Sequence, residues 1–206
     1  YFDVFAVSLT VGKTSRTVRF LGKKEVFDAP IVGQLAAALG GIRVDRGTGS
    51  DAPLEAATAA LEAGEMVAIM PQGTIPRGRA FYDPALQGRW GAARLAVLTG
   101  APVIPMGIWG TEKVWPRNSQ VPLVWNVLNP PKVTITVGPE VALRRDGDAA
   151  ALADENTKRM MSAISNLLPP EARVAREPTE AELRAALPSN YTGDLNAEFT
   201  RRPGTD

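Results

Sequence analysis

Residues 66–79 read MVAIMPQGTIPRGR, an apolar run that stops at Pro71 and is followed at once by a glycine, a hydroxyl and two arginines. The run 66–70 has the continuous apolar character of a parallel strand that is covered on both faces. In open α/β sheets, ligands bind in the crevice at the carboxyl ends of the strands. Because the guanidinium fork matches phosphate and carboxylate bidentately, arginines at such a strand end predict an anion site.

Strand and helix patterns alternate along the rest of the chain. Strands are predicted at 17–21, 42–44, 66–70, 103–108 and 133–137, and helices at 29–39, between 51 and 64, at 91–99 and at 154–168. Residues 3–9 are too few to separate helix from strand. The alternation predicts an α/β fold with a mostly parallel central sheet flanked by helices. We expect one domain over residues 1–168, followed by a charged, proline-containing tail over 169–206 that is loosely docked or disordered.

Composition removes several classes of function. The chain carries 23 basic and 22 acidic residues, and this balance does not predict a nucleic-acid partner. It has no cysteine, which excludes disulfides and thiol catalysis, and no histidine, so a zinc site is not expected. No run reaches the roughly 18 apolar residues of a membrane span. Because the chain also starts at Tyr1 rather than Met, we expect it to be a domain of a longer protein.

Four short pieces of sequence occur in a fixed order along the chain. They are Asp3, Arg46 in GIRVDR (residues 41–46), PQGT (residues 71–74) with Arg77 and Arg79, and VIP (residues 103–105). Each alone has an ordinary structural explanation, such as a helix cap, a solvated loop charge or a proline at a strand edge. Together they resemble the glycerolipid acyltransferase family, whose best known members acylate lysophosphatidic acid. The resemblance covers about residues 1–140 and implies a glycerophosphate acyltransferase-like fold.

The first family motif is His-x-x-x-x-Asp, and Asp3 matches its aspartate. The motif histidine would therefore precede Tyr1, outside this chain. The resemblance implies that this histidine is the general base and that the aspartate orients it. A neutral imidazole can take the proton of an attacking alcohol, and a carboxylate fixes the tautomer of the ring. The alcohol then attacks the thioester of an acyl-CoA or acyl carrier protein, with no other cofactor and no metal implied.

The remaining motifs imply two substrate sites. The residues assigned to binding the acceptor are Arg46, Pro71, Gln72, Gly73, Thr74, Arg77, Arg79 and Arg89. Ile104 and Pro105, which match the Val/Ile-Pro strand of the fourth motif, are assigned to the acyl site.

The third motif departs from the family pattern Phe-Pro-Glu-Gly-Thr-Arg at two positions. Gln72 replaces the glutamate, which removes a negative charge but keeps an acceptor and adds donors. Ile75 replaces the arginine and cannot bind phosphate. We expect an O-acyltransferase of phospholipid biosynthesis that acts on 1-acylglycerol-3-phosphate. Two alternatives stay open, an acyltransferase of the same fold with another lysophospholipid or a glycolipid as acceptor, and a non-catalytic lipid-binding or partner domain.

The segment that contains Trp109, Trp115 and residues 123–125 is rich in amphipathic aromatic and apolar side chains. Such side chains suit a membrane interface, where the substrates of the resembling family reside, and they equally suit a loop that covers the core. The resemblance implies a peripheral protein on the cytoplasmic face of a membrane. Its expected partners are the lysophospholipid, the acyl donor, the membrane surface and other domains of a longer chain.

Overall fold

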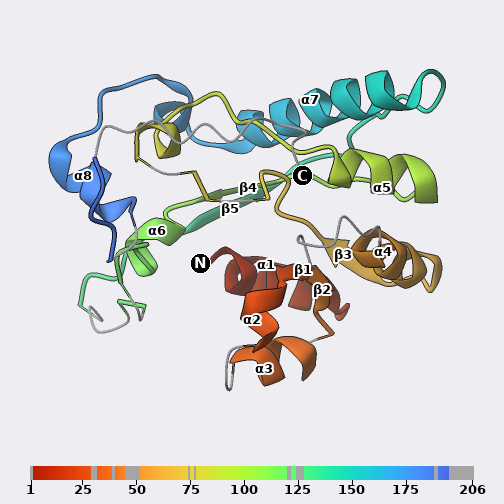
Figure 1. Ribbon diagram of the computed structural model, residues 1–206, viewed down its shortest axis with the longest axis horizontal. Coiled ribbons are helices and arrows are strands. Elements are labelled where there is room, and N and C mark those ends of the chain that lie inside the picture. The colour runs from red at the N-terminus through yellow and green to blue at the C-terminus, as the bar shows by residue number, and fades with distance from the viewer. Residues whose placement is uncertain are drawn as a thin grey trace.

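The computed structural model describes residues 2–28, 32–38, 40–44, 52–73, 75–76, 78–119, 122–123, 128–187 and 190–194 (Figure 1). Its strands are β1 (Val18–Lys23), β2 (Ile42–Val44), β3 (Met66–Ala68), β4 (Met106–Trp109) and β5 (Thr134–Val137). Its α-helices are α1 (Asp3–Gly12), α2 (Lys24–Asp28), α3 (Val32–Ala38), α4 (Ala52–Glu62), α5 (Gly91–Thr99), α6 (Thr111–Val114), α7 (Ala149–Leu167) and α8 (Glu180–Ala185). Two 3₁₀ turns, η1 (Gly78–Phe81) and η2 (Pro170–Arg173), complete the described part.

A parallel sheet with the order β2-β1-β3 confirms the predicted fold class. Leu21 of β1 lies opposite Ile42 of β2, and Val18 lies opposite Met66 of β3. β4 and β5 form a separate antiparallel pair, in which Met106 lies opposite Val137. The fold is therefore α/β with helices around a parallel sheet, and the antiparallel pair is an addition that the sequence did not predict.

The strand predicted at 103–108 begins only at Met106, because proline has no N–H to donate. The residues before it still pair irregularly with the chain beyond β5. The carbonyl of Pro105 accepts from the N–H of Gly138 at 2.9 Å, and the carbonyl of Val103 accepts from the N–H of Val141 at 2.9 Å. The fourth motif therefore continues the antiparallel pair without regular strand geometry.

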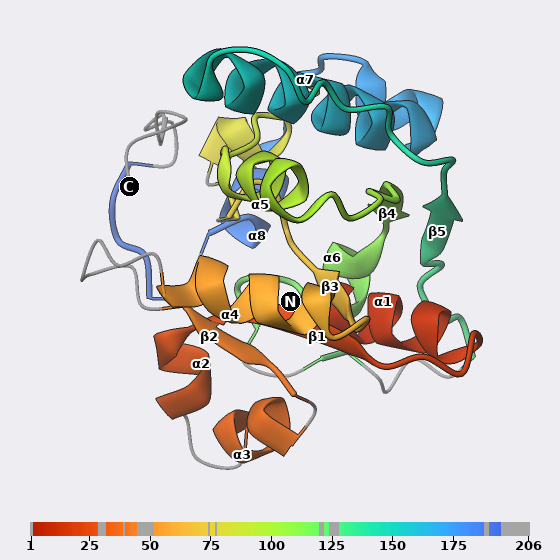
Figure 2. The same cartoon turned by 90° about the vertical axis from the view of Figure 1, so that its right-hand side faces the viewer.

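Two apolar clusters meet at α5. The first, between the parallel sheet and α4, contains Ile42, Ala57, Ala60 and Leu95. The second lies between α5 and α7 and contains Ala93, Ala96 and Met160. Figures 1 and 2 place α7 at one end of the molecule and α2 with α3 at the other, so that α5 lies against both the sheet side and α7. Burial of these apolar faces is what joins the layers.

Close approach to α7 requires glycine at two positions. A Cβ on Gly107 of β4 would lie 2.7 Å from Cβ of Leu167, and a Cβ on Gly88 would lie 2.7 Å from Cγ of Met161. Both distances are shorter than any ordinary carbon–carbon contact. The strand that leads to α6 and the loop that follows η1 are therefore both packed directly on α7.

Two boundary predictions need correction. The helix predicted at 29–39 is described only over α3 (Val32–Ala38), and a separate helix, α2 (Lys24–Asp28), which the sequence did not predict, precedes it. Residues 3–9, which the sequence left open between helix and strand, belong to the helix α1. The strand predicted at 66–70 ends at Ala68, because the carbonyl of Met70 is used in a turn that accepts from the N–H of Gly73 at 2.9 Å.

The start of the predicted tail is folded. Residues 170–187, here called the C-terminal segment, contain η2 and α8, and Leu183, Ala186 and Leu187 are buried. The capping box formed by Thr179 and Glu182 begins α8, and the buried apolar side chains pack the segment against the rest of the protein.

The side chain of Asn156 joins α7 to the loop after β5. It is fully buried, its Nδ2 donates to the carbonyl of Arg144 at 2.8 Å, and its Oδ1 accepts from the N–H of Arg144 at 2.9 Å. One amide thus satisfies both backbone groups of a residue that no regular strand pairs. The N-terminus of the same helix is capped by Asp148, which accepts from the N–H groups of Ala150 and Ala151.

We expect Asn156→Ala to lower the free energy of unfolding by about 1–3 kcal/mol, because it removes the two hydrogen bonds that a fully buried amide makes to the backbone of Arg144. Urea unfolding followed by circular dichroism measures this loss. Asn166→Ala, at an exposed position of the same helix, is the matched control and should change little. Equal stability of the two variants would contradict the role given to Asn156.

Candidate active site

A hydrogen bond joins the first motif to the end of β4. The hydroxyl of Thr111 donates to Oδ1 of Asp3 at 2.8 Å, across 108 positions of sequence. Thr111 is buried, and Asp3 is half-buried in the first turn of α1. A carboxylate in that turn also faces the positive end of the helix dipole. The aspartate predicted as catalytic is therefore held beside the carboxyl end of β4, a strand of the antiparallel pair.

The backbone at Gly110 explains why Thr111 reaches this position. Gly110 has a φ of 93°, in the left-handed region that favours glycine. A Cβ at this position would also lie 2.3 Å from the carbonyl oxygen of Lys132. Strand β4 therefore turns sharply at Gly110 and begins α6 with Thr111 directed at Asp3.

The third motif forms a tight turn after β3. Gly73 closes it with a φ of 66°, and its N–H donates to the carbonyl of Met70. The carbonyl of Pro71 accepts from the N–H of Arg89 at 2.8 Å, and the terminal guanidinium nitrogens of Arg89 are buried. The structure thus brings together the turn and one of the arginines that the sequence assigned to the acceptor.

Arg117 holds the residues that follow this turn. Its Nη1 donates to the carbonyl of Ile75 at 3.0 Å and to the carbonyl of Pro76 at 2.9 Å. Arg117 is half-buried and follows α6 in the chain. A guanidinium that binds two consecutive carbonyls fixes the path of the backbone there.

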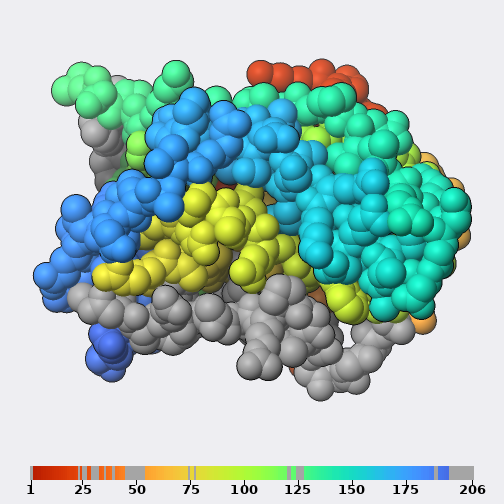
Figure 3. Space-filling view, turned by 90° about the horizontal axis from the view of Figure 1, so that it is seen from above, coloured from red at the N-terminus to blue at the C-terminus, as the bar shows by residue number. Residues whose placement is uncertain are grey.

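The C-terminal segment packs over η1. The hydroxyl of Tyr82 donates to the carbonyl of Glu182 at 2.9 Å, and the guanidinium of Arg176 lies 5.1 Å from the centre of the Tyr82 ring. Arg79 is ion-paired with the exposed carboxylate of Glu177. Figure 3 shows the loop after β3, in yellow, at the surface between α7 and the C-terminal segment in blue. One predicted acceptor arginine is thus engaged by a carboxylate of this segment.

This packing shifts the pKa values of Tyr82 and Glu182. Burial, and then the nearby carboxylate of Glu182, raise the pKa of Tyr82 to about 12, so its hydroxyl stays a donor at ordinary pH. Paired hydrogen bonds from Arg176, at 2.9 and 2.7 Å, are the main reason that the pKa of Glu182 is lowered to about 2. Glu182 is therefore a carboxylate throughout the physiological range.

The other predicted site residues are placed as follows. Gln72 lies in the turn between Pro71 and Gly73 and is half-buried. Pro105 is buried, whereas Ile104 is 50% exposed. Arg46, Thr74 and Arg77 lie outside the described residues, so the predicted convergence of the arginines on one pocket stays a prediction. Of the apolar stretch around 109–125, Trp109 and Trp115 are half-buried and Leu123 is 45% exposed, while 124 and 125 are outside the described residues.

Local sequence patterns do not single out Thr111, Arg117 or Glu182. Thr111 follows a glycine at a strand end, which indicates a turn but does not indicate that Thr111 will contact Asp3. Arg117 lies in a stretch whose functional signal comes from its aromatic residues alone. Thr179 and Glu182 fit the capping-box spacing, which predicts a helix start in the supposed tail.

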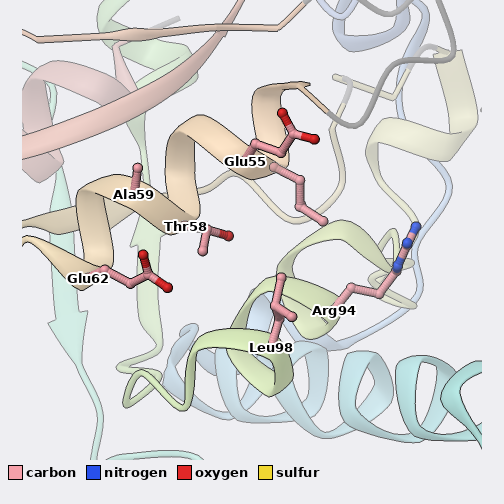
Figure 4. A pocket seen from close by; sticks show the side chains of 7 residues that line it. Glu55, Thr58, Ala59, Glu62, Arg94 and Leu98 are labelled. Carbon is pink, nitrogen blue, oxygen red and sulfur yellow. The ribbon is translucent and has the colours of Figure 1, made fainter.

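A shallow hollow between α4 and α5 lies apart from these motifs. Figure 4 shows Thr58 and Glu62 of α4 on the side towards Arg94 and Leu98 of α5, and Glu55 also lines the hollow. None of its lining residues belongs to the predicted site. Among the described residues, no three carboxylates lie close enough together to bind a metal ion, and no helix has both the length and the apolar content to cross a bilayer.

Comparison with known proteins supports the resemblance. Residues 1–109 match the model of the acyltransferase family. An uncharacterized protein of Mycobacterium tuberculosis is 32% identical over 141 residues, which are 66% of this chain and 37% of the relative. A 1-acyl-sn-glycerol-3-phosphate acyltransferase of Cocos nucifera is 29% identical over 120 residues, 57% of this chain and 37% of the relative. The chain thus spans little more than a third of the length of these curated relatives.

A solved structure has the same fold. The crystal structure of the 1-acyl-sn-glycerophosphate (LPA) acyltransferase PlsC from Thermotoga maritima aligns with a TM-score of 0.52 and 23% sequence identity. The alignment covers 78% of this chain and 59% of that protein. At this identity the likeness shows the fold alone.

We expect acid to undock the C-terminal segment. A carboxyl whose pKa is lowered on folding stabilises the fold above its ordinary pKa of 4.5, and this contribution is lost as the pH falls towards about 2. Amide hydrogen exchange of Leu183 and Ala186, corrected for the intrinsic rate, should accelerate in that window. Glu182→Gln should loosen the same amides already at pH 7, whereas Glu180→Gln, which alters an exposed pair with Arg184 on the same helix, should not. Exchange in Glu182→Gln that matches the unaltered protein would contradict this role.

Proposed function

Because this chain belongs to the acyltransferase family, we propose that it is the catalytic domain of an O-acyltransferase that moves a fatty acyl group from a thioester to the hydroxyl of a lysophospholipid. The favoured acceptor is 1-acylglycerol-3-phosphate. The observation that carries the proposal is the hydrogen bond between Asp3 and Thr111. It holds the aspartate of the first motif at the end of the strand that continues from the fourth motif.

In the proposed reaction, Asp3 orients a histidine that lies five positions before it in the complete protein. The imidazole takes the proton of the acceptor hydroxyl, and the oxygen attacks the thioester carbonyl. The thiol of the carrier leaves and the acyl ester forms. The donor is an acyl-CoA or an acyl carrier protein, and the complete protein acts peripherally at the cytoplasmic face of a membrane.

The acceptor's phosphate would bind beside the turn of the third motif. The support for this location is the hydrogen bond from the backbone N–H of Arg89 to the carbonyl of Pro71, which places Arg89 beside the turn. The terminal guanidinium nitrogens of Arg89 are buried, so this side chain would have to open towards the phosphate. Arg79 would contribute only if it leaves Glu177, since the two side chains are paired. The proposed acceptor site also includes Arg46, Thr74 and Arg77. The proposed acyl site is formed by Ile104 and Pro105.

A second acceptor class is favoured by the sequence of the turn itself. Gln72 and Ile75 stand where the family usually has glutamate and arginine, so the site carries one acid and one base fewer. A different lysophospholipid or a glycolipid fits such a site. A non-catalytic lipid-binding domain is the remaining alternative, and the residue five positions before Asp3 separates it from the enzyme.

We expect Asp3→Asn to lower kcat by at least about 100-fold in the complete protein, the lower range for loss of a working general base. Asparagine keeps the shape but cannot stabilise an imidazolium ion. Initial rates with acyl-CoA and lysophosphatidic acid measure the effect. Asp154→Asn on α7, which only alters an exposed pair with Lys158, is the control. Full activity in Asp3→Asn would remove Asp3 from the mechanism.

We expect Arg89→Ala to lower kcat/KM for lysophosphatidic acid about 10- to 100-fold, because one charge-assisted hydrogen bond to phosphate is lost. An uncharged acylglycerol should be affected less. Arg89→Lys keeps the positive charge and serves as a second variant in case Arg89→Ala does not fold. Arg94→Ala, on the exposed face of α5, is the matched control.

Ile75→Arg restores the family residue and should raise kcat/KM for the phosphate-bearing acceptor, while Gln72→Glu should be tolerated. Equal losses for both acceptors in Arg89→Ala would show that the turn does not recognise phosphate. The second acceptor class would then become the better proposal.

A further inference from the structure

Two contacts tie one short segment to both halves of the candidate site. Its first helical residue, Thr111, binds the aspartate of the first motif, and Arg117 binds the backbone just after the turn of the third. Resting on the proposed function, we propose that Gly110–Arg117 is a positioning bridge that sets Asp3 relative to the acceptor-binding turn. Thr111 and Arg117 are its two positioning residues, and neither is assigned to touch substrate.

The contact at Thr111 has the properties of a positioning contact. The hydroxyl is on a buried side chain and donates to one defined oxygen of Asp3 at 2.8 Å. A carboxylate that orients an imidazole must keep its own plane fixed, and a donor on one oxygen restricts its rotation. The preceding turn sets where Thr111 lies, because Gly110 has a left-handed backbone and packs closely against the carbonyl of Lys132.

The contact at Arg117 acts on backbone rather than on a side chain. Its Nη1 is shared between the carbonyls of Ile75 and Pro76, which are the residues between the turn and η1. Because proline has no N–H, Pro76 cannot anchor this stretch through a donor of its own. The guanidinium of Arg117 therefore holds this stretch through its two carbonyls.

The segment between these contacts is held by its own hydrogen bonds. The N–H of Trp115 donates to the carbonyl of Thr111 at 2.9 Å, and the N–H of Lys113 to that of Gly110 at 3.2 Å. The indole Nε1 of Trp115 donates to the carbonyl of Ser119 at 3.2 Å, which closes the loop beyond Arg117. A displacement of one end is thus passed to the other.

The bridge predicts different kinetic effects at its two ends. Misplacement of Asp3 by about 1 Å should lower kcat, since misplacement on this scale can cost about 100-fold. Misplacement of the turn should weaken acceptor binding and raise its KM. A purely structural role would instead lower the amount of folded enzyme and change neither constant of the folded fraction.

The test is a set of variants in the complete protein, assayed with acyl-CoA and lysophosphatidic acid. Thr111→Val keeps the shape and removes the hydroxyl, and it should lower kcat about 10- to 100-fold with little change in acceptor KM. Thr111→Ser should restore kcat to within about threefold of the unaltered enzyme, because a donor returns. Arg117→Gln should mainly raise acceptor KM. Thr99→Val, which removes a hydroxyl bond to Leu95 within α5, is the matched control.

Hydrogen exchange of the first turn of α1 is measured on the same variants. Faster exchange in Thr111→Val than in Thr111→Ser, together with the kinetic split, supports the bridge. Normal kcat in Thr111→Val, or equal losses in the valine and serine variants, overturns it and leaves the proposed function intact. No turnover by the unaltered protein with any acceptor overturns the proposed function, and the positioning role falls with it even if the exchange pattern shows the contact.

Discussion

The hydrogen bond from Thr111 to Asp3 is the contact on which the candidate site depends. The two residues are far apart in sequence, Asp3 at the start of α1 and Thr111 at the start of α6, just after β4. Their meeting requires the sharp turn at Gly110, and that turn requires a residue without a Cβ. The chemistry proposed for Asp3 therefore depends on the backbone of β4 as much as on the aspartate.

The position of β4 is fixed in turn by α7. Gly107 brings the strand into direct contact with Leu167, and Gly88 brings the loop after η1 against Met161. Asn156 ties the same helix to the chain beyond β5 through both backbone groups of Arg144. A helix that carries none of the motifs thus supports two segments that carry them. Substitutions on the packed face of α7 should therefore affect the site by displacing these two segments, and not by removing a group that takes part in the reaction.

The sequence predicted the fold class, because this depends on local patterns. The roles of the motif residues rest on the family resemblance and stay predictions. Apolar runs, strand ends and helix caps are encoded within a few positions of each other, as in the strand that precedes Pro71. Pairing across the chain is not encoded in this way. Nothing near Arg79 indicates that Glu177 will pair with it, and nothing near Thr111 indicates Asp3. The folded C-terminal segment was missed for a different reason, since low apolar content outweighed a capping-box signal at Thr179 that was present.

In the proposed site Thr111 and Asp3 act as one unit, and a double-mutant cycle on kcat measures their coupling directly. The cycle compares Asp3→Asn, Thr111→Val and the double variant in the complete protein, with Thr99→Val in place of Thr111→Val as the parallel control. If the two residues act together, adding Thr111→Val to Asp3→Asn costs less than about threefold, although alone it costs about 10- to 100-fold. If the loss in the double variant instead equals the product of the two single losses, as expected for Thr99→Val combined with Asp3→Asn, then Thr111 does not act through Asp3.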